Sequence, residues 1–394
     1  MKRTWRNDTP YPGKAIKLES SVLQISSLST EIIFWLIALI SLILTVFFWH
    51  KLTPSKFRHV TARVSAIVFI QVFALAATGI TINRAGEFYS SWGDLFGSKN
   101  QLAKIAIQPN LLAQISAKDI LAAKRTTGGS LILREVIKGA HSNISDVVYV
   151  VLPPSIAAQM EANPSSPTVG TNYQVVELFP GYPGVPQTWI NSMAGVSTLE
   201  RLENAGTVQN TIAIIPAINV SPGQDTECLN FVGGPQVETW ISTDMHEFAT
   251  KFLGIDARPW TSFGYSTGGW CAAEVAVRHP DLYSNAISLA GYFKPLFSLG
   301  VSKREKKYLT TRYDLIAALQ KSQSPIHMMI IASAKDKFTN KAAKDFITAA
   351  SALVPIRYIP IPIGGHNTNV WKPFVGTAFE WMNQQNTSTG SATP

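Results

Sequence analysis

The sequence predicts an α/β fold, in which a mostly parallel sheet is covered by helices on both faces, preceded by two transmembrane helices. Three observations carry this prediction. Two long uncharged apolar stretches lie near the N-terminus, and short apolar runs alternate with helical stretches after Ser130. Side chains able to do chemistry follow directly after several of these runs, where a parallel sheet binds its ligands.

The two apolar stretches are residues 32–49 and 64–82, and neither contains a charged side chain. At 1.5 Å per residue, each is long enough to cross a hydrocarbon core of about 30 Å. Two buried core helices fit less well because of this length. A cleaved signal peptide also fits less well, because the segment before Ile32 is long, no A-x-A site follows, and a second span comes directly after. We therefore expect residues 1–83 to form a membrane anchor whose partner is the lipid bilayer.

The distribution of charge bears on partners and on orientation. The chain carries a net charge of +9, but residues 1–63 hold nine Lys and Arg against three acids. No basic stripe with interleaved aromatics is present, so we expect no nucleic-acid partner. The loop between the spans contains Lys51, Lys56, Arg58 and Arg63 and no acid. Such loops stay in the cytoplasm, which favours a multi-pass plasma-membrane protein with an extracytoplasmic catalytic domain, although the basic N-terminal tail leaves the orientation open.

Beyond the anchor, the 394 residues divide into three further parts. Residues 84–129 are expected to form a juxtamembrane connector, with interfacial aromatics after the second span and a helical stretch at 110–124. Residues 130–385 are expected to form the catalytic domain. The polar residues 386–394 are expected to form a disordered tail.

The catalytic domain shows the alternation that is typical of a parallel sheet. Apolar runs predict strands at 131–137, 147–152, 173–179, 211–216, 260–263, 285–289, 326–332 and 356–361. Helices are predicted at 239–252 and 268–279.

The motif G-x-S-x-G occurs at Gly264-Tyr265-Ser266-Thr267-Gly268, between a predicted strand and a predicted helix. This is the context of the nucleophile turn of α/β-hydrolases, where glycines permit a sharp bend that exposes the serine hydroxyl. Ser266 is therefore the candidate nucleophile. The backbone N–H of Thr267, at the helix N-terminus, is a candidate donor to the oxyanion.

A serine hydroxyl needs a base, and the base needs an acid that orients it. His366 follows the strand at 356–361 and is the candidate base, since the other histidines do not fit the chain order of the fold. Asp336 follows the strand at 326–332 and is the candidate acid. Asp314 and Glu305 are weaker alternatives, because both lie in a helical insertion.

A second oxyanion donor is expected in the loop after the strand at 173–179. This loop reads Pro-Gly-Tyr-Pro-Gly from residue 180 to residue 184. The N–H of Tyr182 is the candidate, because Pro183 has none to donate. A plain Pro/Gly turn is the alternative.

Taken together, FPGYPGVPQTW, DTEC, GYSTGGWCAAEVAVRHPDLY and GGHNTNVW resemble the putative-esterase branch of the α/β-hydrolases, which includes esterase D-like enzymes and the mycolyltransferases. With NRAGEFYSSW after the span, the sequence is similar to membrane-anchored actinobacterial members. The resemblance implies a nucleophile at Ser266, a base at His366 and an oxyanion loop at Gly181-Tyr182. The chain departs from it in having two spans, in Phe-Pro-Gly where His-Gly is usual, and in an acid matched by position alone.

These observations favour a membrane-anchored serine esterase that hydrolyses carboxylic esters, of lipids or other acyl compounds, through an acyl-serine intermediate. Acyl transfer to a cell-envelope sugar or lipid and a non-catalytic wall-binding domain are the alternatives. We expect no cofactor and no metal, since neither a Walker loop, a dinucleotide fingerprint nor a metal-ligand cluster is evident. The sequence predicts no oligomeric state.

The only two cysteines, Cys228 and Cys271, are predicted to form a disulfide. Cys228 lies in the loop after the strand at 211–216, and Cys271 lies on the helix that follows Ser266. Both are therefore expected at the same edge of the sheet. Two separate thiols are the alternative.

Overall fold

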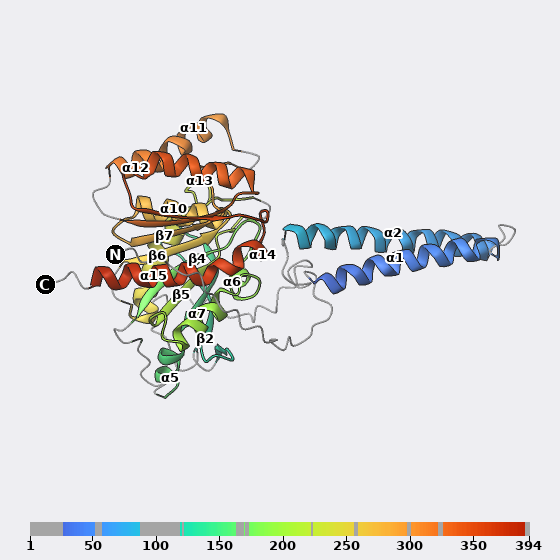
Figure 1. The fold of residues 1–394 in the computed structure, drawn as a ribbon, viewed down its shortest axis with the longest axis horizontal. Helices are drawn as coiled ribbons and strands as arrows, with labels where there is room; N and C mark the ends of the chain where they lie inside the picture. The colour runs from blue at the N-terminus through green and yellow to red at the C-terminus, as the bar shows by residue number, and fades with distance from the viewer. Residues whose placement is uncertain are drawn as a thin grey trace, which may run out of the picture.

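The computed structural model describes residues 27–51, 57–86, 119, 122–162, 169, 173–221, 224–255, 259–297, 301–321 and 326–390. Within these residues, nine strands form one sheet in the order β1-β2-β3-β5-β4-β6-β7-β8-β9 (Figure 1). The strands are β1 (Lys124–Arg125), β2 (Leu131–Lys138), β3 (Ser145–Leu152), β4 (Gln174–Phe179), β5 (Thr211–Pro216), β6 (Trp260–Tyr265), β7 (Tyr283–Leu289), β8 (His327–Ser333) and β9 (Ile356–Ile361). Strands β4 to β9 run parallel, whereas β1, β2 and β3 pair antiparallel at one edge.

The central strands are buried on both faces, which explains their continuous apolar runs. Successive side chains point to opposite faces, so Ile212 and Ile214 pack into one hydrophobic core while Ala213 and Ile215 pack into the other. Helices cover both faces, as expected for an α/β protein. Helices α10 (Thr267–Arg278), α12 (Leu315–Lys321) and α13 (Lys337–Ala350) lie on one face, and α7 (Gly195–Asn204) and α15 (Val375–Gly390) lie on the other (Figure 1).

The described residues of the domain form further helical segments. They are α5 (Pro154–Ala162), α6 (Gln187–Ile190), α8 (Val237–Thr239), η2 (Trp240–Asp244), α9 (Met245–Phe248), η3 (Ala249–Leu253), α11 (Lys303–Arg312), α14 (Thr368–Trp371) and η4 (Lys372–Phe374). The helix predicted at 239–252 corresponds to the segment from α8 to η3, in which π-helical turns alternate with α-helical ones.

The strand order reverses between β4 and β6, and this reversal sets the position of the site. From β4 the chain crosses to β5 on one side, whereas from β6 it crosses through α10 to β7 on the other side. The loops that leave the carboxyl ends of β4 and β6 therefore diverge. Ligands of open α/β sheets bind in the crevice at such a point.

The predicted fold class is confirmed, and the predicted strands agree with the observed ones to within two residues. The structure differs at the two ends of the domain. The stretch at 110–124 was expected to be helical, and its described C-terminal residue, Lys124, instead belongs to β1. It does so because residues 126–130 form a tight turn with Gly129 at φ 106°, which lets β1 pair with β2. Of the rest of that stretch, the structure describes residues 119, 122 and 123, of which Asp119 and Ala122 are helical, as predicted.

The predicted disordered tail, residues 386–394, also starts before the last helix ends. Helix α15 continues to Gly390. Asn386 holds it against the sheet, because its Nδ2 donates to Gln174 Oε1 at 2.7 Å and its Oδ1 accepts from Asn285 Nδ2 at 2.7 Å.

Two apolar helices precede the domain. Helix α1 (Leu28–Phe48), which continues into the short η1 (Trp49–Lys51), and α2 (Phe57–Gly86) lie side by side (Figure 1). Both are long and apolar enough to cross a membrane. They include the spans predicted at 32–49 and 64–82.

Cys228 and Cys271 are joined by a disulfide, with 5.6 Å between their Cα atoms. Both side chains are fully buried. The bond links the segment after β5 to the first turns of α10. Trp270 Nε1 also donates to the carbonyl oxygen of Glu227 at 2.8 Å, so a hydrogen bond reinforces the same junction.

We expect the Cys228→Ser/Cys271→Ser double variant to be less stable than the wild type. The disulfide closes a loop with a sequence separation of 43, so its loss should lower the free energy of unfolding by about 4 kcal/mol in the chain-entropy model. Denaturant unfolding of the purified full chain, as oxidised wild type and as the double variant, measures this. Equal unfolding curves for the two proteins would contradict the expectation.

Candidate active site

Ser266 occupies the sharp turn between β6 and α10. Its backbone has φ 55° and ψ −122°, a conformation that residues other than glycine rarely adopt. Hydrogen bonds hold this conformation. Ser266 N donates to Leu289 O at 2.9 Å, and Ser266 O accepts from Gly269 N at 2.9 Å. A strained serine fixed in this way presents its hydroxyl above the carboxyl edge of the sheet.

The two glycines of the motif are required by close packing. A Cβ on Gly264 would lie 1.9 Å from Gly268 O, and a Cβ on Gly268 would lie 2.2 Å from Phe179 O. Real Cβ atoms do not approach backbone this closely, so the turn between β6 and α10 can pack against the end of β4 only with glycine at both positions.

The structure brings Ser266, His366 and Asp336 together in one hydrogen-bonded chain. Ser266 Oγ lies 2.8 Å from His366 Nε2, and His366 Nδ1 lies 2.5 Å from Asp336 Oδ2. The three residues come from the loops after β6, β9 and β8. The Trp371 indole packs against the imidazole of His366 at an interplanar angle of 83°, with ring centroids 4.6 Å apart.

Asp336 is anchored as the N-cap of α13. Its Oδ1 accepts from Thr339 N at 3.2 Å, and its Oδ2 accepts from the Thr339 hydroxyl as well as from His366. Burial alone would raise the pKa of Asp336, but the hydrogen bonds from His366 and Thr339 outweigh it and lower the pKa below its ordinary value. The carboxylate is therefore ionised at neutral pH and can accept a hydrogen bond from the Nδ1–H group of His366.

The loop that contains Tyr182 lies directly beside Ser266. A Cβ on Gly181 would be 3.1 Å from Ser266 Cβ. Asn219 Nδ2 holds the loop by donating to Gly181 O at 3.0 Å and to Gly184 O at 2.6 Å. The Tyr182–Pro183 peptide is cis. Thr267 is the first residue of α10, at the positive end of the helix dipole. The oxyanion roles of Tyr182 and Thr267 remain predictions.

A buried polar cluster beside Ser266 was not predicted. The hydroxyl of Thr267 donates to Asp225 Oδ2 at 3.0 Å and accepts from the Tyr292 hydroxyl at 3.2 Å. Burial raises the pKa of Asp225, against the hydrogen bonds from Glu227 N and Thr267. Asp225 lies in DTEC, a motif that contributes to the family resemblance but gave Asp225 no predicted role, and Tyr292 carries no sequence signal of its own.

Two other contributors were missed for different reasons. Thr339 stands three residues after Asp336, the spacing at which an N-cap side chain meets the helix, so a capping analysis would have found it. Asn219 follows β5 and reaches a loop more than thirty residues earlier in the sequence. Only the folded chain reveals that contact.

The other histidines and acids considered for the base and the acid have other partners. His279 Nε2 lies 3.0 Å from Glu238 Oε1, and His246 stacks on Trp260 with ring centroids 3.5 Å apart. Asp314 accepts from Ile316 N and Ala317 N at the start of α12. Glu305 accepts from Val232 N. None of these contacts is with Ser266 or His366.

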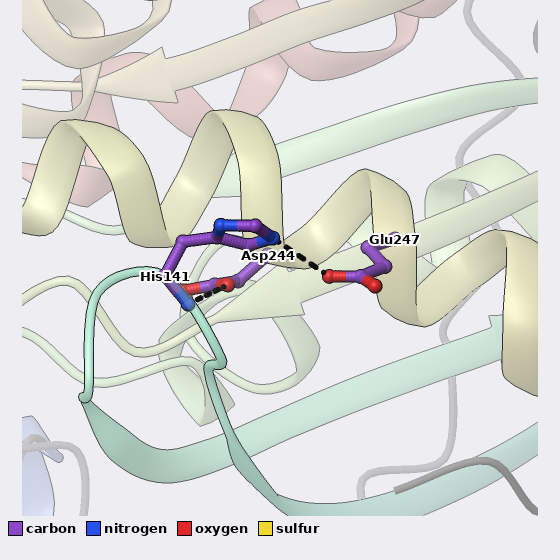
Figure 2. Close-up of side chains that lie close together, drawn as sticks. All are labelled: His141, Asp244 and Glu247. Carbon is purple, nitrogen blue, oxygen red and sulfur yellow. Dashed lines mark hydrogen bonds and ion pairs between the residues drawn. The ribbon is translucent and has the colours of Figure 1, made fainter.

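Among the described residues, one group of side chains has the composition of a metal site. His141, Asp244 and Glu247 offer ligand atoms within 4.8 Å of one another (Figure 2). However, Asp244 Oδ1 and Oδ2 accept from His141 N at 2.9 Å and Ser142 N at 3.0 Å, and Glu247 pairs with Lys251 as well as with His141. The cluster therefore joins the β2–β3 turn to the helical segment formed by η2 and α9. The expectation of no metal site stays a prediction.

We expect Asp244→Ala to lower the free energy of unfolding by about 1–3 kcal/mol, because it removes the acceptor of two backbone N–H groups. Glu247→Ala is the matched control and should change it by less than about 1 kcal/mol, since its ion pairs are exposed. Thermal unfolding with EDTA and with added Zn²⁺ completes the measurement. A metal-dependent rise in Tm that Glu247→Ala abolishes would show a metal site instead.

Comparison with known proteins places this geometry in a family. A family model described as Putative esterase matches residues 148–391. An uncharacterized protein of Corynebacterium glutamicum is 24% identical over 224 residues, which cover 53% of this chain and 52% of that protein. The chain thus matches about half the length of this curated relative.

Solved structures show the same fold at low sequence identity. A ferulic acid esterase superposes with a TM-score of 0.53 and 16% identity, over 65% of this chain and 98% of the esterase. The S-formylglutathione hydrolase of Agrobacterium tumefaciens superposes with a TM-score of 0.53 and 12% identity, over 66% and 97%. A fluorophosphonate-binding serine hydrolase of Staphylococcus aureus superposes with a TM-score of 0.52 and 18% identity, over 64% of this chain and 98% of that hydrolase.

The predicted likeness to the esterase branch of the α/β-hydrolases is therefore confirmed, and with it, at the level of the family, the expectation of an enzyme that acts on carboxylic esters. Because the family model covers more than half of the chain, and because the solved neighbours share its fold, the chain belongs to the Putative esterase family of α/β-hydrolases.

Proposed function

We propose that this protein is a membrane-anchored serine esterase that hydrolyses carboxylic esters, including those of lipids, through an acyl intermediate on Ser266. The observation that carries the proposal is the hydrogen-bonded chain from Ser266 Oγ through His366 to Asp336, at 2.8 and 2.5 Å. Such a chain activates a hydroxyl for attack on an acyl carbon.

In the first step, Ser266 Oγ attacks the ester carbonyl while His366 Nε2 takes its proton. Asp336 accepts a hydrogen bond from the Nδ1–H group of His366, which fixes the tautomer of the imidazole and stabilises the imidazolium. The N–H groups of Tyr182 and Thr267 are the proposed donors to the oxyanion that develops. His366 then returns the proton to the leaving alcohol, which departs and leaves an acyl-serine.

In the second step, water attacks the acyl-serine, with His366 as base and then as acid. The product is a carboxylic acid, and Ser266 regains its proton. The same residues thus serve both halves of the reaction.

Membrane anchoring is supported by the surface of α1 and α2. Only 6% of the most apolar segment of α1, and 11% of that of α2, is buried inside the structure. Large side chains such as Phe47 and Leu75 are each 73% exposed. A core helix of a soluble protein would bury them. Polar contacts gather at the hairpin ends. Glu31 pairs with Arg84 at one end, and Arg63 donates to Trp49 O at the other.

An extracytoplasmic catalytic domain is supported by two features. The loop between the spans is basic and free of acid, as is usual for cytoplasmic loops. The Cys228–Cys271 disulfide suits an oxidising compartment.

A fluorophosphonate probe should label the wild type and not Ser266→Ala. His366→Ala should lose nearly as much turnover of p-nitrophenyl esters as Ser266→Ala, by at least about 10⁴-fold in kcat, because the two residues act as a unit. Gel fluorescence and initial rates measure both effects. Labelling that persists in Ser266→Ala, or turnover that survives in His366→Ala, would reject the corresponding role.

For topology, single cysteines introduced at Ser55 and Ser388 provide the test, since the native pair is disulfide-bonded. In intact cells, a membrane-impermeant maleimide should modify the cysteine at residue 388 and spare the one at residue 55. Both should react after the cells are permeabilised. The reverse pattern would place the enzyme in the cytoplasm.

A further inference from the structure

A rim of exposed apolar side chains surrounds the candidate active site. It consists of Tyr182, Val185, Leu296, Phe338 and Ile363, which are 37%, 38%, 43%, 53% and 74% exposed. These residues come from the loops after β4, β7 and β9 and from the start of α13, which follows β8. They therefore lie at the carboxyl edge of the parallel strands, where Ser266 also lies.

Three contacts connect the rim to the site. Tyr182 follows Gly181, which lies against Ser266. The Phe338 ring is 6.3 Å from that of Tyr292, whose hydroxyl contacts Thr267. Ile363 precedes Gly364, whose carbonyl oxygen accepts from the Ser333 hydroxyl.

The rim is also basic. Its loops carry the exposed side chains of Lys294, Lys335 and Lys337. The acids on or against these loops are Asp336, which is engaged with His366, and the buried Glu227, which accepts from Leu296 N and Phe297 N. Helix α11 adds the exposed Lys303, Arg304 and Lys307 against the half-buried Glu305, which accepts from Val232 N. It lies beside the rim, because Lys306 Nζ is 5.9 Å from the centroid of the Phe297 ring.

We propose that this rim docks onto the surface of an anionic bilayer, so that the acyl chain of a membrane ester reaches Ser266 without crossing water. Apolar side chains enter the boundary between headgroups and acyl chains, while the lysines meet lipid phosphates. The inference deepens the proposed function and rests on the membrane anchor of the same chain, which keeps a bilayer within reach.

The charge of the rim selects this occupant over a second copy of the chain. Two rims placed face to face would oppose like charges, which disfavours a self-complementary contact. An anionic surface has the complementary sign.

The test measures the depth of single labelled residues in full-length protein reconstituted into vesicles. A bimane fluorophore attached to Ile363→Cys reports whether the rim enters the bilayer. A bimane on Thr207→Cys is the control, because Thr207 is exposed in the segment before β5, at the amino edge of the strands. Quenching by doxyl-labelled lipid is compared in vesicles of phosphatidylcholine alone and of phosphatidylcholine with phosphatidylglycerol.

We expect quenching at residue 363 but not at residue 207, stronger with phosphatidylglycerol and weakened by salt. The variant Lys294→Gln/Lys303→Gln/Lys307→Gln should reduce quenching at residue 363. It should also lower turnover of a vesicle-embedded ester by about tenfold or more, because each cation near an anionic surface adds to binding. Its turnover of a soluble short-chain ester should stay within about twofold of the wild type, because none of the three lysines belongs to the triad.

Equal quenching at the two labelled positions would overturn docking, as would quenching at residue 363 that does not respond to phosphatidylglycerol. Neither result depends on catalysis. Failure of the proposed esterase would instead appear as absent turnover of the soluble ester, and failure of the anchor as extraction of the chain by alkaline carbonate.

Discussion

The turn between β6 and α10 is the constraint around which the site is built. Ser266 adopts φ 55° there, and such a residue persists only where its surroundings hold it. Leu289 O and Gly269 N supply the hydrogen bonds, and the missing side chains of Gly264 and Gly268 supply the space. This packing against the end of β4 leaves the hydroxyl of Ser266 facing the loops after β8 and β9.

Each neighbouring loop has its own polar anchor, so the geometry does not depend on the loops themselves being stiff. Asn219 holds the Tyr182 loop, and Thr339 holds Asp336. Glu227 holds the loop after β7 by accepting from Leu296 N and Phe297 N. The disulfide at Cys228 fixes the segment that carries Glu227 to α10. Ser266, Asp336 and the loops beside them are therefore held by several independent contacts, which is the pre-organisation that the proposed covalent catalysis needs.

The parts of the fold that the sequence predicted are those with a local or periodic signal. Continuous apolar runs located the strands at 211–216 and 356–361 to the residue, and the glycine spacing around Ser266 located the turn. The sequence placed Ser266, His366 and Asp336 at one edge of the sheet because each follows a strand, and parallel strands bring such positions together; their catalytic roles stay predictions.

What the sequence could not provide depends on contacts between distant segments. Asp225 and Tyr292 meet at Thr267 only after β5, β6 and β7 have paired. The role of Asp244 is set by backbone N–H groups of a turn about one hundred residues earlier. The polar composition of residues 386–390 predicted disorder, whereas Asn386 is held by partners on β4 and β7.

The most direct test of the central claim is to isolate the acyl-enzyme. A slowly released aromatic ester is mixed with the full chain in detergent, the reaction is stopped with acid, and the reduced, alkylated protein is digested with trypsin. Peptide mass spectrometry should find the acyl group on Ser266, within residues 252–278, because trypsin cuts after Lys251 and Arg278 but not between Arg258 and Pro259. Its abundance should rise and fall with turnover. An acyl group on another residue, or rapid turnover with no acylated peptide at any time, would contradict nucleophilic catalysis by Ser266.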